Sequence, residues 1–171
     1  MNTKKTLFLG LLAAIASTAA FSQETATATA TAKIVTPISI TKDVDMNFGN
    51  VAVQSTNGGT VVLAPAGTRT STSGVTLPAV TGTVTAASFT VNGDGAYTYA
   101  ISLPTGSHVI SNGANSMNVT DFKSTPTGTG TLSAGTQQLK VGATLNVGAA
   151  QAAGTYTSAE LSPFAVTVNY N

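Results

Sequence analysis

The chain has 171 residues, of which 8% are charged, and its formal net charge is +1. This length is typical of one domain, and so weak a charge gives no electrostatic reason to expect nucleic acid or an anionic membrane surface as a partner. The absence of cysteine excludes disulfide frameworks, thiol nucleophiles and cysteine-ligated metal centres.

The first 22 residues have the pattern of a secretory signal peptide. Two lysines precede an apolar run at 7–16, and small residues follow up to Ser22. The run is about half the roughly twenty residues that a membrane-spanning helix needs, and no second candidate span follows. We therefore expect an exported protein without an integral membrane span. Cleavage is expected after Ser22, with Ala19 and Ala20 as competing positions, which leaves 149 residues.

Residues 23–35 are predicted to be an N-terminal extension or a first strand. Small apolar and polar side chains alternate along this segment, so that threonines share one face of an extended chain. Pro37 interrupts the alternation because proline cannot donate a backbone hydrogen bond within a sheet. The residues of the apolar face are Ala26, Ala28, Ala30, Ala32 and Ile34.

The remaining residues, 36–171, are predicted to form one β domain. No stretch shows the apolar periodicity of a helix, and short alternating runs are separated by glycine, asparagine, aspartate or proline. This pattern favours an antiparallel, immunoglobulin-like Greek-key β-sandwich, with a closed barrel as the lesser alternative. The expected strands are 38–41, 45–53, 60–64, 82–91, 96–103, 117–123, 131–132, 138–147, 154–157 and 163–170.

Two connections carry specific expectations. The sequence Asn-Gly-Asp-Gly at 92–95 separates 89–91 from 97–101, and this turn chemistry predicts an antiparallel hairpin. Residues 67–74, which include Arg69, the chain's one arginine, are expected to be an exposed loop.

Residue types suited to catalysis are sparse. His108 is the single histidine and lies in a turn-like stretch, so we interpret it as a solvated loop residue. Asp43 and Asp45 are the only close pair of acids, and no metal-binding spacing or nucleophile motif accompanies them. We expect no enzyme activity, no catalytic residues, no metal and no cofactor. A carbohydrate-active enzyme that uses Asp43, Asp45 or Asp121 is the weakest of three hypotheses.

The two ends of the mature chain complement each other. Residues 164–170 alternate strictly, which predicts a strong strand close to the end of the sequence. Such a strand needs a partner for its second edge, and the alternating segment 23–35 offers one. The pairing within one chain or between neighbouring chains is left open by the sequence. The inward residues of the C-terminal strand are Phe164, Val166, Val168 and Tyr170.

These features resemble a known family. The alternating alanines and threonines, Ile38-Ser39-Ile40, the stretch Asn47-Phe48-Gly49 and the closing run 164–170 are similar to a widespread family of secreted bacterial domains of unknown function. That family is similar in turn to spore coat protein U-type domains and to fimbrillins of the chaperone-usher pathway. The likeness extends over about 25–171, and the stretches at 89–93 and 97–104 resemble the family's central hairpin.

The resemblance implies an incomplete, pilin-like subunit. Phe164, Val166, Val168 and Tyr170 would form the strand that a periplasmic chaperone holds. Ala26, Ala28, Ala30, Ala32 and Ile34 would be the donor strand that completes the next identical subunit. An outer-membrane usher would then export the assembly from the periplasm to the cell surface as a fimbrium. The alternative hypothesis is a self-complete, monomeric secreted adhesin or matrix-binding β-sandwich, in which 24–35 pairs within its own chain.

Overall fold

The computed structural model describes residues 23–158 and 163–171, and the expected signal peptide lies outside this part of the chain. The chain divides into two units, Met1–Lys33 and Ile34–Asn171. In the first unit, residues 23–33 are exposed and contain neither helix nor strand. The alternating segment is therefore not part of a sheet in the isolated chain.

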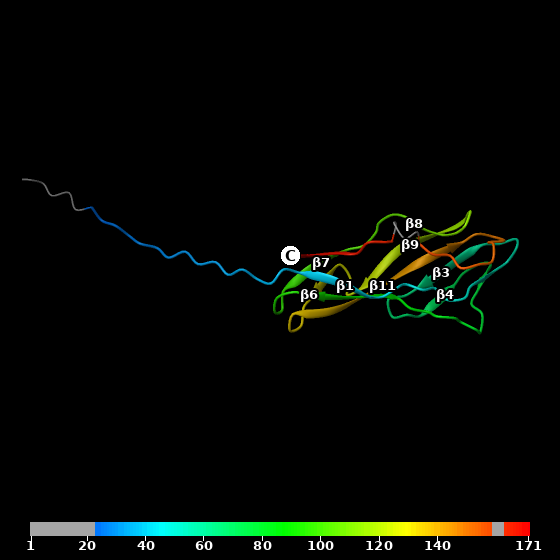
Figure 1. Ribbon diagram of the computed structural model, residues 1–171, viewed down its shortest axis with the longest axis horizontal. Helices are drawn as coiled ribbons and strands as arrows, with labels where there is room; N and C mark the ends of the chain where they lie inside the picture. The colour runs from blue at the N-terminus through cyan, green and yellow to red at the C-terminus, as the bar shows by residue number, and fades with distance from the viewer. Residues whose placement is uncertain (1–22, 159–162) are drawn as a thin grey trace, which may run out of the picture. The chain divides into compact units, whose positions relative to one another are not determined.

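The second unit is all-β throughout its described residues, as predicted. Its larger sheet has seven antiparallel strands, with the order β1-β6-β11-β3-β4, while β9 pairs with β11 and β8 with β9. Figure 1 shows β9, β11 and β3 side by side. The strands of this sheet are β1 (Ser39–Val44), β3 (Gly59–Leu63), β4 (Arg69–Ser71), β6 (Ala87–Asn92), β8 (His108–Asn112), β9 (Asn115–Thr125) and β11 (Thr136–Val147).

Two smaller sheets complete the domain. A three-stranded antiparallel sheet has the order β10-β7-β12, and a two-stranded sheet joins β2 to β5. No helix in the described residues is both long and apolar enough to cross a membrane. The strands of these sheets are β2 (Ala52–Val53), β5 (Val75–Thr76), β7 (Thr98–Ser102), β10 (Thr129–Thr131) and β12 (Thr167–Tyr170).

Strand β11 organises the larger sheet. Along one edge, its residues 136–141 pair with β6 and its residues 143–147 pair with β3, while residues 140–146 pair with β9. Every second side chain, from Leu139 to Val147, is buried. This is the period of two that the sequence of 138–147 predicted.

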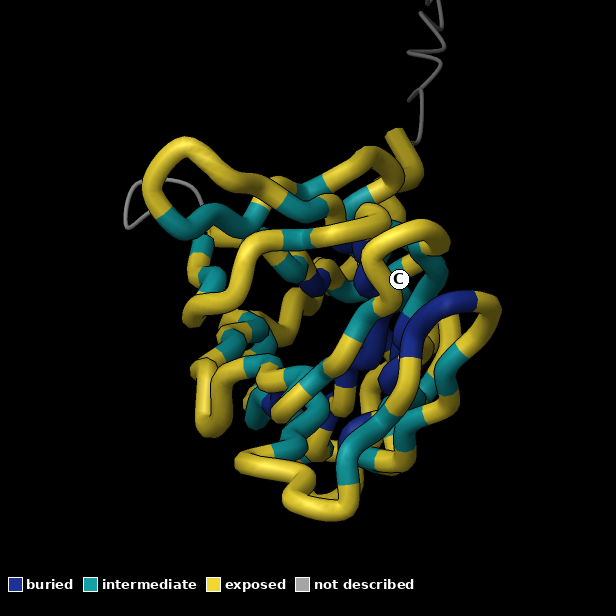
Figure 2. The backbone as a smooth tube through the Cα atoms, turned by 90° about the vertical axis from the view of Figure 1, so that its right-hand side faces the viewer, coloured by how far each residue is buried: buried dark blue, intermediate teal, exposed yellow. Residues whose placement is uncertain are grey.

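The core consists of two clusters of buried side chains. The first joins residues of β6 and β11 to Tyr99 of β7 and Val168 of β12, so the larger sheet packs against the three-stranded sheet. The second gathers β3, β5, β9 and β11 around Val61 and Leu145. Figure 2 shows the buried residues in the interior of the domain and exposed residues along its outer loops. The arrangement is sandwich-like, as expected.

The predicted hairpin between 89–91 and 97–101 is wrong. Strand β6 pairs with β1 along one edge and with β11 along the other, so it has no edge left for β7. Strand β7 pairs instead with β10 and β12. The glycine-rich turn at 92–95 therefore carries the chain from one sheet to the other rather than reversing it within a sheet.

Other differences concern the short strands. Most of the expected strands 45–53 and 154–157 is irregular, with only β2 and the single bridges of Asn47 and Thr157. Strands β5 and β8 were not predicted. The expected exposed loop 67–74 contains β4, because residues 69–71 pair with residues 61–63 of β3. In addition, the guanidinium of Arg69 donates hydrogen bonds to the backbone oxygens of Phe48 and Asn50.

Candidate functional site

The C-terminal strand presents one apolar face to the core. Val168 is only 7% exposed within the first cluster, and Phe164, Val166 and Tyr170 pack against the same cluster half-buried, while the residues between them are exposed. The alternation therefore places the four predicted side chains on the inward face. The regular strand is shorter than the expected 163–170, because only β12 pairs with β7.

Several strands of the domain have one unpaired edge, and two of them, β1 and β12, lie close to each other. Strand β12 pairs only with β7, and β1 pairs only with β6, among the described residues. Cα atoms of β1 and β12 approach within 8 Å of each other, yet no backbone hydrogen bond joins the two strands in the described structure. The domain thus has two neighbouring edges that face each other without a ladder.

Beyond β1 and β12, the gap between the two edges widens into a hollow. We define the seam as the line along which β1 and residues 45–53 face residues 151–158 and 163–170. Its wide part is a cavity of about 1330 Å³ whose floor comes from β9 and β11. We call this cavity the hollow. Its principal apolar side chains are Met46, Phe48, Ile110, Met117, Val119 and Leu145.

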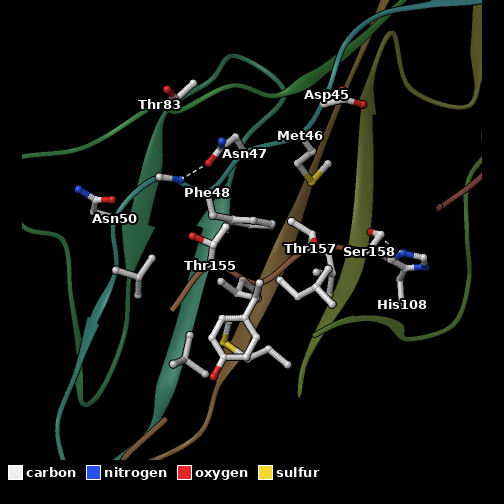
Figure 3. Close-up of a pocket in the computed structure, with 18 of the residues that line it drawn as sticks. Asp45, Met46, Asn47, Phe48, Asn50, Thr83, His108, Thr155, Thr157 and Ser158 are labelled. Carbon is white, nitrogen blue, oxygen red and sulfur yellow. Dashed lines mark hydrogen bonds between the residues drawn. The ribbon is translucent and has the colours of Figure 1, made fainter. Parts of the chain in front are cut away.

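Figure 3 shows the side chains of Met46 and Phe48 directed into the hollow from one wall. Backbone hydrogen bonds hold that wall, because Asn47 N donates to Thr85 O at 2.8 Å and Asn50 N donates to Thr81 O at 2.7 Å. The opposite wall is tied to β8, since Ser111 N donates to Thr157 O at 2.9 Å. The hollow therefore lies between two fixed walls.

The stretch Asn47-Phe48-Gly49 is a backbone turn that aims Phe48 inward. Gly49 N donates to Asn47 Oδ1 at 2.8 Å, and Gly49 has a φ of 67°, which favours glycine. The Arg69 guanidinium holds the carbonyls on both sides of this glycine. The family-like motif thus has a local structural role in building one wall of the hollow.

Tyr170 marks the narrow end of the seam. Its hydroxyl donates to Thr36 O at 2.8 Å and accepts from Asp94 N at 2.7 Å. A side chain at Gly93 would collide with the Tyr170 hydroxyl, so glycine is needed for this close approach. Tyr170 therefore ties the start of the domain to the turn between the sheets.

His108 is not the solvated loop residue that the sequence indicated. It lies in β8, half-buried, and its Nε2 is 3.0 Å from Ser158 Oγ. Its ring also contacts Phe164 edge-on, with ring centroids 6.0 Å apart. His108 therefore joins β8 to the margin of the hollow (Figure 3). Because residues 104–107 have the composition of a turn, the sequence did not predict this strand.

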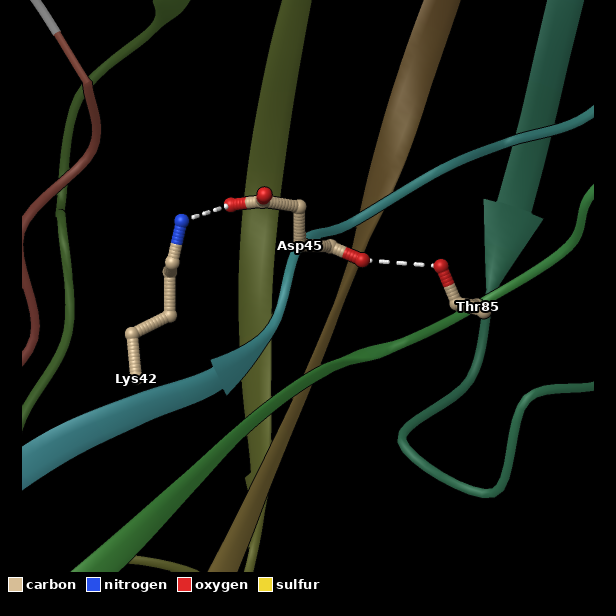
Figure 4. Close-up of polar contacts among 3 residues, drawn as sticks. All are labelled: Lys42, Asp45 and Thr85. Carbon is tan, nitrogen blue, oxygen red and sulfur yellow. Dashed lines mark hydrogen bonds and ion pairs between the residues drawn. The ribbon is translucent and has the colours of Figure 1, made fainter.

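The candidate acids are dispersed in small local contacts. Lys42 Nζ lies 2.6 Å from Asp45 Oδ1, and Thr85 Oγ1 donates to Asp45 O at 2.8 Å (Figure 4). Asp43 accepts from Thr90, and Asp121 from its neighbour Thr120. Within the described residues, no three histidine or acidic side chains lie together as metal ligands.

The predicted donor side chains are all accessible. Ala26, Ala28, Ala30 and Ala32 are exposed, and the exposed fraction of Ile34 is 95%. Sequence reasoning recognised the alternation of both this segment and the C-terminal face, but it missed the hollow that lies beside the C-terminal strand. The alternation of Met46 and Phe48 with polar neighbours was the available signal.

Comparison with known proteins identifies the family. The chain belongs to the family described as Domain of unknown function (DUF4402), whose model matches residues 38–170. No curated protein and no solved structure matches the chain. The expected membership in a family of unknown function is confirmed. The likeness to spore coat U-type and fimbrillin domains stays a prediction.

Proposed function

We propose that this protein is an exported, non-enzymatic structural subunit that assembles at the cell surface by β-strand exchange. In this proposal the domain is an incomplete immunoglobulin-like sandwich, and the leading peptide of one copy, residues 23–35, completes the seam of the next. The observation that carries the proposal is the seam itself, with two facing unpaired edges above an apolar floor.

Strand addition suits both partners of the exchange. An extended peptide satisfies the unpaired backbone groups of an edge strand, while alternate side chains enter the core. Residues 23–33 are exposed and free of regular structure, so no existing sheet must be broken before they pair. Their alanines are small, and each buried methyl group contributes only about 0.8 kcal/mol. Backbone pairing would therefore supply much of the stability of the junction.

A single subunit with an open seam is at risk of aggregation. Unpaired strand edges recruit other strands, and the apolar floor adds an adhesive surface. We therefore include in the proposal a periplasmic chaperone that pairs with the free edge of the strand bearing Phe164, Val166, Val168 and Tyr170 during transit. An outer-membrane usher would then exchange the chaperone for the next subunit.

One observation favours the alternative, a self-complete monomeric adhesin. A strand inserted between β1 and β12 needs two inter-strand spacings, about 9.5 Å in all, whereas Cα atoms of the two strands already approach within 8 Å. Insertion therefore requires the two edges to separate by at least about 1.5 Å at the narrow end. A monomer would keep this end closed.

The test compares purified residues 23–171 with a variant that lacks residues 23–33. The full mature protein should form a ladder of oligomers that resists sodium dodecyl sulphate at room temperature, and the shortened variant should run as a monomer. Circular dichroism should show that the shortened variant keeps the β structure of the folded domain, because residues 23–33 contain no strand in the isolated chain. Oligomers that persist in the folded shortened variant would contradict the proposal, as would a full mature protein that remains monomeric.

A further inference from the structure

We infer that Ile34 of an incoming leading peptide occupies the hollow, so that the peptide runs antiparallel to β12. This inference rests on the proposed function and assigns the direction and register of the exchanged strand. It follows from where the leading peptide joins its own domain, from the size of the side chains along that peptide and from the shape of the seam.

The leading peptide joins its own domain at Ile34, which we call the root of the peptide. Ile34 is the first residue of the second unit, and it lies two positions before Thr36, whose backbone oxygen is held by the Tyr170 hydroxyl at 2.8 Å. Each domain therefore begins at the narrow end of its own seam. The next domain cannot approach from this end without meeting that root.

The position of the root determines the direction in which the incoming peptide runs along the seam. A neighbouring domain must approach from the hollow, at the opposite end of the seam. The root of its leading peptide, Ile34, then enters the hollow, and the earlier residues extend towards Tyr170. Since β12 itself runs from the hollow at Phe164 to the narrow end at Tyr170, the incoming peptide is antiparallel to it.

The sizes of the side chains along the leading peptide match the width of the seam. Ile34 is the only large apolar residue within 23–34, and it is the most exposed of the large hydrophobic residues in the described chain. The hollow is the wide part of the seam, and its floor includes Met117 and Leu145. Cα atoms of β1 and β12 approach within 8 Å, so the two edges must separate to admit a peptide, and small side chains require the least separation. The order of alanines followed by isoleucine matches this shape.

Length agrees with the assignment. Residues 23–34 comprise 12 residues, and β11 also has 12. Strand β11 extends from the hollow, which Leu145 and Val147 line, to the core cluster that Leu139 shares with Val168 of β12. Two extended segments of equal length cover the same distance, about 40 Å. A peptide that starts at the hollow with Ile34 therefore reaches the narrow end with its first residues.

The first experiment measures dissociation of assembled protein after Ile34→Ala, with Val80→Ala as the matched control. Val80 is 76% exposed and lies outside the seam. We expect subunits of Ile34→Ala to dissociate about 30-fold faster than wild type, because the lost burial removes most of the contribution of this side chain. Val80→Ala should match wild type. Equal rates for Ile34→Ala and wild type would overturn the inference while leaving the proposed function intact.

The second experiment reads the register directly, using the absence of native cysteine. Mixtures of Ile34→Cys and Met117→Cys subunits should form a disulfide between copies after mild oxidation, and mixtures of Ala26→Cys and Met117→Cys should not. The reverse result would show a parallel peptide and overturn the inference alone. Wild-type protein that never assembles would overturn the proposed function together with it.

Discussion

Tyr99 shows how a polar group is accommodated in the centre of the core. The side chain is fully buried, and its hydroxyl donates to Gln137 Oε1 at 2.7 Å. The same oxygen accepts from Thr131 N at 3.0 Å, so Gln137 fixes both β7 and β10. Burial raises the pKa of Tyr99 above its usual 10.0, because the charged phenolate would lose hydration.

This environment predicts a loss of stability in alkali. The unfolded chain gives up the Tyr99 proton once the pH passes 10.0, whereas the folded chain retains it up to the raised pKa. The contribution of Tyr99 to the free energy of unfolding should therefore be constant below pH 10 and should fall above it. Urea titrations of wild type and Tyr99→Phe from pH 8 to 11 check the sign. The alkaline fall should be smaller in Tyr99→Phe.

At neutral pH, Tyr99→Phe should cost about 1 kcal/mol, the value of one hydrogen bond whose acceptor retains a second donor. Tyr97→Phe is the matched control, because the Tyr97 side chain is 45% exposed. An alkaline fall of equal size in wild type and Tyr99→Phe would contradict the role given to Tyr99.

Gly49 provides a second test at the scale of the residue. Its φ of 67° is unfavourable for other residues, and a β-carbon would collide with Thr81 O and approach Val84 Cγ2 to 2.7 Å. Gly49→Ala should therefore lower the free energy of unfolding by about 3 kcal/mol. Gly67 has a φ of 87° but open space around it, so Gly67→Ala should cost only about 1 kcal/mol. Thermal or urea denaturation compares the two, and equal losses would show that the packing at Gly49 is unimportant.

At the scale of the element, β11 carries the largest share of the core. Leu139 is completely buried, with β6 on one side of the strand, and its removal leaves a cavity. Leu139→Ala should lower the free energy of unfolding by about 3 kcal/mol. Val62 on β3 is 36% exposed, so Val62→Ala should cost under about 1 kcal/mol. Urea denaturation measures both, and a cost at Leu139 no greater than at Val62 would contradict the assigned core.

The elements also show what the sequence could predict. Alternation identified β3, β6, β7, β9 and β11, because each buries one face and the period of two is local information. Alternation does not specify partners. The turn at 92–95 predicted a hairpin, but β6 has both edges occupied by β1 and β11, which are distant in sequence. Pairing between distant strands decided the outcome.

The candidate site was predictable to a similar extent. Phe164, Val166, Val168 and Tyr170 were recognised as an inward face because their pattern is regular. The hollow was not recognised, since its walls are irregular segments held by contacts such as the hydrogen bonds of Arg69 to Phe48 and Asn50. No local pattern in the sequence encodes those contacts. Similarly, His108 joins Ser158 only because β8 and the segment 151–158 meet in the fold.

In the molecule as a whole, the domain has a seam with no strand between its two edges. The larger sheet and the three-stranded sheet share a core, yet β1 and β12 have no hydrogen-bonded partner along the seam in the described residues. The leading segment 23–33 has the alternation of a strand and is in no sheet. Assembly by exchange explains both facts together.

The most direct measurement is amide hydrogen exchange of the variant that lacks residues 23–33, with and without a synthetic peptide of residues 23–35. We predict that the peptide slows exchange at residues 39–44 and 164–170, because new backbone hydrogen bonds would form along both edges. A control peptide with Ala28→Lys and Ala30→Lys should have no effect, because burying two unpaired charged side chains along the seam is unfavourable. Unchanged exchange along both edges at saturating native peptide would contradict strand exchange as the function of the seam.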